Sequence, residues 1–389
     1  MLLTYQDLLD HALAYAATDA TGAATRQHRA AAQAAYNALA IRHGWNYYWT
    51  LGRINTDAPY STGTVEFDLT GGATERRLTL TGGTWPTWAA LGYVSLNDGT
   101  YGVERRVSST VLTLAAASSP SEDIAAGSSY SIIRDTYPLP SDFVAMDDVV
   151  AGTSGEPVEY IHPRRWATDA RHITPSQPRC ISLVGSSTTN GALMAVFAPS
   201  PDRVYPVDFT YRRRPRPILF EGPMTGLVTV AANGTTVTGE GTAFRAAMVG
   251  SILRLGYDNK NRPTGLAGGT PRAHEAVITA YTSPTSVEID TGPAEAADRV
   301  TFAVTDPCDI DEVGMTEYLL RELEMQWRAV SRSSGGPLST AGAEKIEYDR
   351  TFTRAMEADN RHIGRKAALR SRAGGINDPY YPLGVAGEA

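Results

Sequence analysis

The spacing of apolar residues divides the chain into helical ends and a strand-rich middle. Near the start, apolar residues recur at helical spacing, which predicts a helix that Thr4 and Asp7 would begin as a capping box. Residues 24–43 are rich in good helix formers, and Gly44 follows them where a left-handed cap is expected. The apolar stripe of the first helix consists of Leu8, Leu9, Ala12, Leu13 and Ala16.

Helical periodicity returns near residue 311, where apolar residues again step by three and four positions. Such a seam needs a partner helix, and the two helices at the start of the chain are the nearest candidates. A further helix is expected over residues 343–369, with Ile346, Thr353, Met356 and Ile363 on one face. The seam residues are Val313, Thr316, Leu320, Leu323, Trp327 and Val330.

Between these ends, short β-branched runs are broken by Gly, Pro, Asn, Asp and Ser, which is typical of an all-β region. A Thr-x-Thr-Gly-(x)-Gly-Thr pattern occurs at residues 79–84 and again at 236–242, and Gly92 and Gly250 follow nine residues after its last glycine. Chance likeness of glycine turns is the alternative explanation, but further blocks match in order. These blocks are Val94 with Ile252, Thr110, Leu112 and Leu114 with Thr285, Val287 and Ile289, and Tyr130 and Ile132 with Phe302 and Val304.

Together these patterns predict an α+β fold. One discontinuous helical domain is built from both termini, and the inserted all-β region contains two similar small β-barrel or sandwich modules. The predicted segments are a helical part over 1–50, a first β module over 51–136, a central β segment over 137–222, a second β module over 223–306, a second helical part over 307–370 and an extended arm over 371–389.

Composition and charge narrow the classes of function. The chain has 389 residues, of which 42% are hydrophobic and 20% charged, which is typical of a globular protein with sizeable cores. Its formal net charge of −7 argues against a nucleic-acid coat with a basic surface. Cys180 and Cys308 are too few for a disulfide framework, so we expect buried thiols in a protein made in a reducing cytoplasm. Neither a signal peptide nor a membrane span is expected.

Catalytic and metal-binding motifs are not found in the sequence. There is no HExxH, no metal-spaced Cys/His cluster, no GxSxG elbow, no dinucleotide GxGxxG after a strand and no phosphate-binding GxxxxGK[ST]. His162 has a structural role in our interpretation, and His28, His43 and His362 are expected on helix surfaces. We therefore predict that the protein is not an enzyme and has no catalytic residue, cofactor or metal.

Three groups of residues carry a resemblance to a known family. They are an arginine-bearing helix that ends in an aromatic run over 29–49, the segment Tyr-Pro-Leu-Pro-Ser-Asp-Phe over 137–143, and the turn Pro-Ser-Pro-Asp over 199–202 followed by Tyr-Arg-Arg-Arg-Pro over 211–215. In this order they resemble the head-to-tail adaptor proteins of tailed bacteriophages, especially short-tailed phages. We expect the aromatic run, Trp45, Tyr47, Tyr48 and Trp49, to close a core rather than to form a stacking platform.

The resemblance implies a structural virion protein at the head–tail junction. Adaptors of this family form a ring, commonly twelve-fold, under the portal protein, extend the DNA channel and provide a platform for the tail nozzle. The DNA passes through the lumen without sequence-specific binding, and an acidic lining would let it slide. By this resemblance the portal-binding residues are Arg361, Arg365, Lys366, Arg370, Arg372, Tyr380 and Tyr381.

The densest basic run contains Arg212, Arg213 and Arg214 and has three possible roles. Strand alternation sends Arg212 and Arg214 to one side and Arg213 to the other, which disfavours a continuous DNA-binding patch. Pairing with carboxylates of a neighbouring subunit is the preferred role, and a solvated edge strand is the alternative.

Two other functions stay open. A receptor- or glycan-binding tail protein would use aromatics such as Trp85 and Trp88, which look exposed in the sequence. A virion-associated peptidoglycan hydrolase would need a carboxylate dyad from distant positions, because the neighbouring pairs Glu322/Glu324 and Asp147/Asp148 point away from each other.

Overall fold

The computed structural model describes residues 3–16, 22–70, 75–97, 99–153, 155–166, 175–186, 191–264, 270–311, 314–331 and 341–362. The fold is mixed α+β, and β-strands outnumber the four α-helices of these residues. The predicted fold class is therefore confirmed at this level. The chain divides into two compact units, one formed by Met1–Tyr48 and Pro215–Ala389 and the other by Trp49–Arg214. The finer segment boundaries stay predictions.

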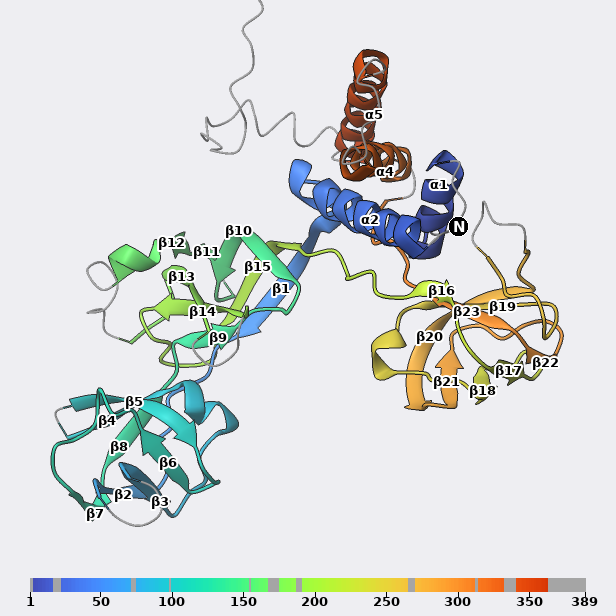
Figure 1. Ribbon diagram of the computed structural model, residues 1–389. Helices are drawn as coiled ribbons and strands as arrows, with labels where there is room; N and C mark the ends of the chain where they lie inside the picture. Colours follow the sequence, from blue (N-terminus) through green and yellow to red (C-terminus); the bar gives the residue numbers. More distant parts are fainter. Residues whose placement is uncertain are drawn as a thin grey trace, which may run out of the picture. The chain divides into compact units, whose positions relative to one another are not determined.

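In the first unit, helices from both ends of the chain share one hydrophobic core. They are α1 (Tyr5–Ala16), α2 (Gly22–Arg42), α4 (Met315–Ser331) and α5 (Ala341–His362). Leu8, Leu39 and Leu323 belong to the same buried cluster. Figure 1 shows α4 between α2 and α5.

Side chains fix the start of α1 and the end of α2. The Asp7 carboxylate accepts a hydrogen bond from the Thr4 backbone N–H (3.0 Å) and the Thr4 hydroxyl accepts one from the Asp7 N–H (3.3 Å), so the predicted capping box is confirmed. The left-handed cap at Gly44 is wrong, because its backbone does not have a positive φ. Instead the Trp45 indole N–H donates to the Leu39 carbonyl (2.8 Å), which satisfies an acceptor in the last turn of α2.

The aromatic run after α2 serves the core only in part. Trp45 and Tyr48 are fully buried, whereas Tyr47 and Trp49 are each 37% exposed. Tyr48 ends the short 3₁₀ turn η1 (Asn46–Tyr48), and its hydroxyl donates to the Asp309 carbonyl (2.8 Å).

The buried face of α4 is wider than the predicted seam. Leu323 lies in the core, and Leu320 and Trp327 pack against it. Tyr318 and Leu319 are fully buried as well, although the seam pattern omits them. The reason is that α4 packs against α2 and also against α5, so two of its sides are covered. Val313 and the side chain of Val330 lie outside the described residues.

The predicted apolar face of the last helix is wrong at two of its three described positions, and the third, Met356, is half-buried. Ile346 is 55% exposed and Thr353 is exposed, while Tyr348 and Ala355 face the core. The buried side of α5 carries Tyr348, Thr351, Ala355 and Asp359, so it has no stripe of large aliphatic residues and the spacing of such residues does not predict it. Ile363 lies outside the described residues.

An 8-stranded sheet completes the first unit. Its strand order is β16-β23-β19-β20-β21-β18-β17-β22, and its inner residues form a separate hydrophobic cluster. The strands are β16 (Glu221–Pro223), β17 (Leu227–Val230), β18 (Thr236–Glu240), β19 (Ile252–Leu255), β20 (His274–Ser283), β21 (Ser286–Ile289), β22 (Ala297–Val300) and β23 (Phe302–Thr305), with the 3₁₀ turn η4 (Ala246–Met248) before β19.

The second unit contains a 7-stranded sheet in the order β7-β2-β3-β6-β5-β4-β8, again with its own hydrophobic cluster. Its strands are β2 (Thr64–Asp68), β3 (Arg77–Thr81), β4 (Tyr93–Leu96), β5 (Gly99–Arg106), β6 (Val111–Leu114), β7 (Ile124–Ser128) and β8 (Tyr130–Ile133), with the 3₁₀ turn η2 (Thr87–Leu91) before β4.

The two sheets share one strand order. Read from β22, the 8-stranded sheet runs 22-17-18-21-20-19-23, which matches 7-2-3-6-5-4-8 strand by strand. Next to β23 lies β16, and at the same place beside β8 Tyr60 forms a single bridge with Ile132. The same hairpin glycines recur: Gly82 and Gly241 have φ of 78° and 68°, a backbone conformation that favours glycine.

The strand register corrects the alignment of the two repeats. The Leu80 N–H donates to the Thr110 carbonyl (2.8 Å), and the Gly239 N–H donates to the Thr285 carbonyl at the same distance (2.8 Å). Leu80 therefore corresponds to Gly239 rather than to Val237. Likewise Val94 corresponds to Leu253 and not to Ile252, since these residues pair with the matching Ile132 and Val304. In this register Gly82 corresponds to Gly241, so the sequence pattern is aligned one or two residues out of place.

Two smaller sheets make up the rest of the second unit and bury a fourth cluster that includes Phe197 and Phe209. One has the order β1-β15-β10-β11 and the other β12-β13-β14-β9. Their strands are β1 (Trp49–Asn55), β9 (Thr136–Pro138), β10 (Phe143–Ala151), β11 (Glu156–Pro157), β12 (Glu159–Tyr160), β13 (Cys180–Gly185), β14 (Leu193–Ala198) and β15 (Pro206–Arg213).

The helical core gives a first prediction. Leu323→Asp places an unpaired carboxylate in the buried cluster and should lower the free energy of unfolding by several kcal/mol, roughly the cost of an unpaired buried charge. Ile346→Asp puts the same charge on the exposed side of α5 and serves as the control. Thermal denaturation followed by circular dichroism measures both, and equal melting temperatures would contradict the packing of α4.

Candidate functional site

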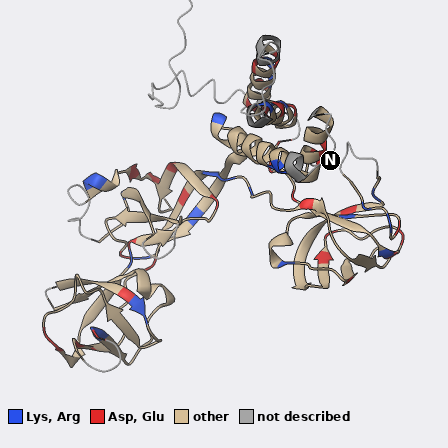
Figure 2. Ribbon diagram, viewed as in Figure 1, with Lys and Arg blue, Asp and Glu red and all other residues tan. Residues whose placement is uncertain are grey.

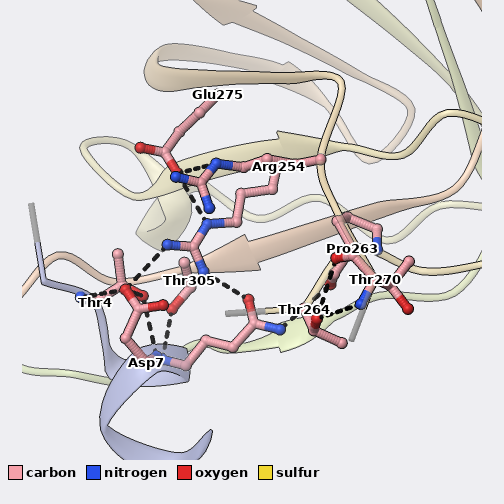
Figure 3. A network of polar contacts seen from close by, with 10 residues as sticks. Thr4, Asp7, Arg254, Pro263, Thr264, Thr270, Glu275 and Thr305 are labelled. Carbon is pink, nitrogen blue, oxygen red and sulfur yellow. Dashed lines mark hydrogen bonds and ion pairs between the residues drawn. The ribbon is translucent and has the colours of Figure 1, made fainter. Parts of the chain in front are cut away.

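A buried polar network joins α1 to the 8-stranded sheet (Figure 3). Arg254, on β19, is fully buried, and its guanidinium donates to Asp7 (3.1 Å), to Gln6 (2.9 Å) and to Glu275 (2.9 Å). The Gln6 backbone N–H donates to the Thr305 hydroxyl on β23 (3.0 Å). The network therefore crosses from the first turn of the helix to three neighbouring strands.

The network is possible because each partner has a fixed local position. Asp7 already belongs to the capping box, so its carboxylate is held before it meets the guanidinium. A buried cation costs several kcal/mol unless it is paired and hydrogen-bonded, and Arg254 has carboxylate partners on both sides. The network fixes the position of α1 relative to the 8-stranded sheet.

Asp306 forms a second buried junction, just after β23. Its carboxylate accepts hydrogen bonds from the backbone N–H groups of Leu219 (2.5 Å) and Phe220 (2.8 Å) and from the Ser251 hydroxyl (2.6 Å). The guanidinium of Arg216 lies 3.5 Å away and also donates to the Gly250 carbonyl. The connection into β16 is thereby tied to the sheet.

The Cys308 thiol has no feature of a reactive site. Burial raises the pKa of the Cys308 thiol well above its usual range, and the nearby carboxylates Asp7 and Asp306 act in the same direction. A thiol that stays protonated is a poor nucleophile. Cys180, expected to be buried, is only half-buried.

A carboxylate is also buried among the helices. Glu322 accepts hydrogen bonds from the hydroxyls of Tyr348 (2.5 Å) and Tyr318 (3.2 Å) and from the Gln326 amide (2.7 Å), and the Arg42 guanidinium lies 3.6 Å away. Burial raises the pKa of Tyr318 to about 12. The neighbouring Glu324 bonds instead to His11 and Arg321, so these two carboxylates do not form a dyad.

The predicted arginine run lies at the end of β15. Arg212 pairs with Trp49 across the strands, Arg213 follows on the face of Tyr211, and the Arg214 N–H donates to the Asp142 carbonyl (2.5 Å). Figure 2 shows basic and acidic segments interspersed along the sheets of both units. Pairing of Arg212, Arg213 and Arg214 with a neighbouring subunit stays a prediction.

The predicted portal-binding residues are almost entirely outside the described part of the chain. Arg361 lies in the last turn of α5, and its side chain is not described. The other six, which lie outside the described residues, are Arg365, Lys366, Arg370, Arg372, Tyr380 and Tyr381.

The histidines and tryptophans differ from expectation in two places. His28 is buried and stacks on Trp327 at 6.1 Å, so its assignment to a helix surface is wrong. His162 caps the 3₁₀ turn η3 (Pro163–Arg165) by accepting from the Arg164 N–H (3.2 Å), a structural role. Trp85, expected to be exposed, lies in the core of the 7-stranded sheet, and Trp88 is partly buried against it.

Sequence reasoning missed the buried ionic residues. Arg254 interrupts the apolar run of β19, and a single arginine between leucines was the available signal. Glu322 and Asp306 carry no such signal, because their partners come from other elements.

Within the described ranges, no group of three or more His, Cys, Asp or Glu side chains could hold a metal ion. No helix of these ranges is long and apolar enough to cross a bilayer. Comparison with protein families, curated proteins and solved structures finds no match to this chain.

The buried network gives a second prediction. Arg254→Met leaves Asp7 buried without its cation and should lower the free energy of unfolding by about 3–5 kcal/mol. Adding Asp7→Asn should recover part of that loss, because the unpaired charge is removed. Chemical denaturation measures both variants. Arg53→Met, which removes an exposed pair with Asp208, is the control and should leave stability nearly unchanged; a similar loss there would contradict the role of burial.

The buried tyrosines give a third prediction. Burial raises the pKa of Tyr318 to about 12, whereas a tyrosine in the unfolded chain ionises near pH 10. The contribution of neutral Tyr318 to the free energy of unfolding is therefore complete below pH 10 and is lost as the pH rises from 10 towards 12. The loss should be on the order of 2 to 3 kcal/mol. Tyr318→Phe should flatten this alkaline decline, measured by denaturation at each pH. A decline of the same slope in both proteins would show that other groups cause it.

Proposed function

We propose that the chain is a structural protein of a tailed-phage virion, a head-to-tail adaptor located at the head–tail junction. In this role it forms a homo-oligomeric ring, twelve-fold as is common in the family, beneath the portal protein. The ring extends the DNA channel and gives the tail nozzle a platform. The proposal assigns no catalysis and no cofactor to the chain.

The observation that carries the proposal is the contact between two of the three groups of residues behind the resemblance, the segments 137–143 and 211–215. Phe143 from the first motif stacks on Tyr211 from the second at 5.8 Å, and the two lie on the neighbouring strands β10 and β15. The Tyr211 hydroxyl donates to the Asp142 carboxylate (3.2 Å) across 69 residues of sequence. Segments matched separately by sequence thus form one packed unit, which favours a shared fold over chance likeness.

The domain plan supports the same proposal. By the resemblance the family's fold applies to the helical core, and here α1, α2, α4 and α5 share one core. We further propose that the 7-stranded and 8-stranded sheets are copies of one small barrel or sandwich module, since their strand orders match. Such modules would enlarge the adaptor beyond its minimal form.

The charge balance is compatible with a DNA conduit. A net charge of −7 means that carboxylates outnumber basic groups, and a lining with that excess would let phosphates pass without holding them. Basic residues near the carboxyl end, Arg361 to Arg372, are proposed for portal contact instead.

Portal binding provides the direct test and a fourth prediction. The full chain mixed with the purified portal protein of the same phage should form rings on portal complexes visible by negative-stain electron microscopy. Deleting residues 370–389 should weaken this binding at least tenfold while the melting temperature stays the same. Replacing the exposed Arg245 and Arg299 by Gln removes charge elsewhere and should not affect binding.

Two outcomes would count against the proposal. If the full chain does not bind the portal at micromolar concentration, the adaptor function is wrong. If the truncated chain unfolds, the carboxyl end belongs to the core rather than to a docking arm.

A further inference from the structure

The 7-stranded sheet carries an aromatic pocket on one side. It is an open depression in the surface rather than an enclosed cavity, and its volume is about 720 Å³. Tyr60, Trp88 and two prolines give it flat apolar walls, Trp85 and Arg106 contribute to it from the sheet, and Thr84 and Ser109 add hydroxyl groups. Among the lining residues Arg106 is the one charged side chain, and no carboxylate lines the pocket.

The wall at Tyr60 is held in place on both sides. Its backbone bridges to Ile132, and its hydroxyl accepts a hydrogen bond from the Thr84 N–H (3.3 Å). A Cβ at Gly83 would lie 2.9 Å from the Tyr60 hydroxyl, so glycine leaves room for it. The aromatic wall is therefore a fixed part of the sheet.

The lining also contains two N–H donors with no acceptor. The Trp85 backbone is tied to Ser109, and the Arg106 guanidinium donates to the Trp85 carbonyl (3.1 Å). Yet the Trp85 indole N–H and the Arg106 Nε–H are buried and find no hydrogen-bond partner among the described residues. Leaving such donors unmet is costly, and Arg106 as a whole is half-buried, so it is the lining residue that an anion could meet.

The second copy of the module serves as an internal comparison. In matching register, Tyr281 of the 8-stranded sheet takes the place of Arg106, and Gly222 takes that of Tyr60. The common fold thus needs neither the guanidinium nor the tyrosine ring. The Arg106 guanidinium and the Tyr60 ring therefore distinguish the 7-stranded sheet, which carries the pocket, from the 8-stranded sheet.

We propose that this pocket binds an acidic saccharide. A pyranose has a flat C–H face, which suits Trp88 and Tyr60, and hydroxyl edges, which suit Thr84 and Ser109. A guanidinium without a carboxylate beside it favours an anionic ligand, and a sugar carboxylate is the planar group that arginine binds best. The site lies wholly within the second unit and does not depend on the adaptor function.

Two other ligands fit less well. A single-stranded nucleic acid needs a row of cations to follow its backbone, and the pocket has one. A proline-rich peptide would use the aromatic walls but has no group that requires the half-buried arginine.

Binding to a panel of oligosaccharides tests the proposal. The probes are trigalacturonate, a hyaluronan tetrasaccharide and sialyllactose, with maltotriose and lactose as neutral counterparts, measured by calorimetry with the full chain. At least one acidic probe should bind tenfold or more tightly than its neutral counterpart. Arg106→Gln should remove that preference, and Trp88→Ala should weaken binding of the acidic probe at least tenfold.

The control is Arg105→Gln, which removes an exposed arginine next to Arg106 on the same strand. It should leave saccharide binding unchanged, and melting temperatures should show that all variants are folded. Failure of every acidic probe to bind would overturn the proposal. So would equal losses in the Arg105 and Arg106 variants, or binding of a proline-rich peptide that Trp88→Ala abolishes while no saccharide binds.

Discussion

The buried pairing of Arg254 with Asp7 is the interaction on which the first unit depends. The same carboxylate begins α1 as part of a capping box and neutralises a guanidinium that has no access to water. Helix start and sheet position are therefore coupled, because moving either one would leave a buried charge unpaired. Asp306 adds a second link of the same kind at the entry to β16, where it gathers backbone N–H groups rather than a cation alone. Apolar packing tolerates small displacements, whereas these polar contacts do not, so they define the register.

Local signals predicted local features well. The capping box at Thr4 and the strands around Leu112 and Val287 depend on neighbours in sequence, and both are present. The α+β class followed from the change of hydrophobic period. The failures have two physical causes. At the end of α2 the side chain of Trp45 caps the helix where a glycine was expected, and α4 is covered on two sides because both α2 and α5 pack against it. The burial of Glu322 could not be predicted from the sequence, because its partners Tyr348 and Arg42 come from other helices.

The two related sheets put one strand order to different uses. In the 8-stranded sheet, the position of Gly222 lies against the Gln6 side chain of α1, and β19 supplies the arginine of the buried network. In the 7-stranded sheet the corresponding positions carry Tyr60 and Ser95, and the chemistry is found instead at Trp88 and Arg106. Two sheets with the same strand order can thus keep their hairpin glycines and their cores while one joins α1 and the other carries a pocket.

The helical core also constrains how the chain is made. During synthesis α1 and α2 emerge first, but α4, which covers them, follows only after every strand of both sheets. Their apolar faces stay uncovered during that time, since a contact of such long sequence separation closes late. The sheets have their own hydrophobic clusters and local hairpins, so they can form earlier. The core that holds the two ends of the chain together is therefore the last part to be completed. A nascent chain stalled before residue 315 exposes the apolar faces of α1 and α2 to any chaperone or neighbouring chain.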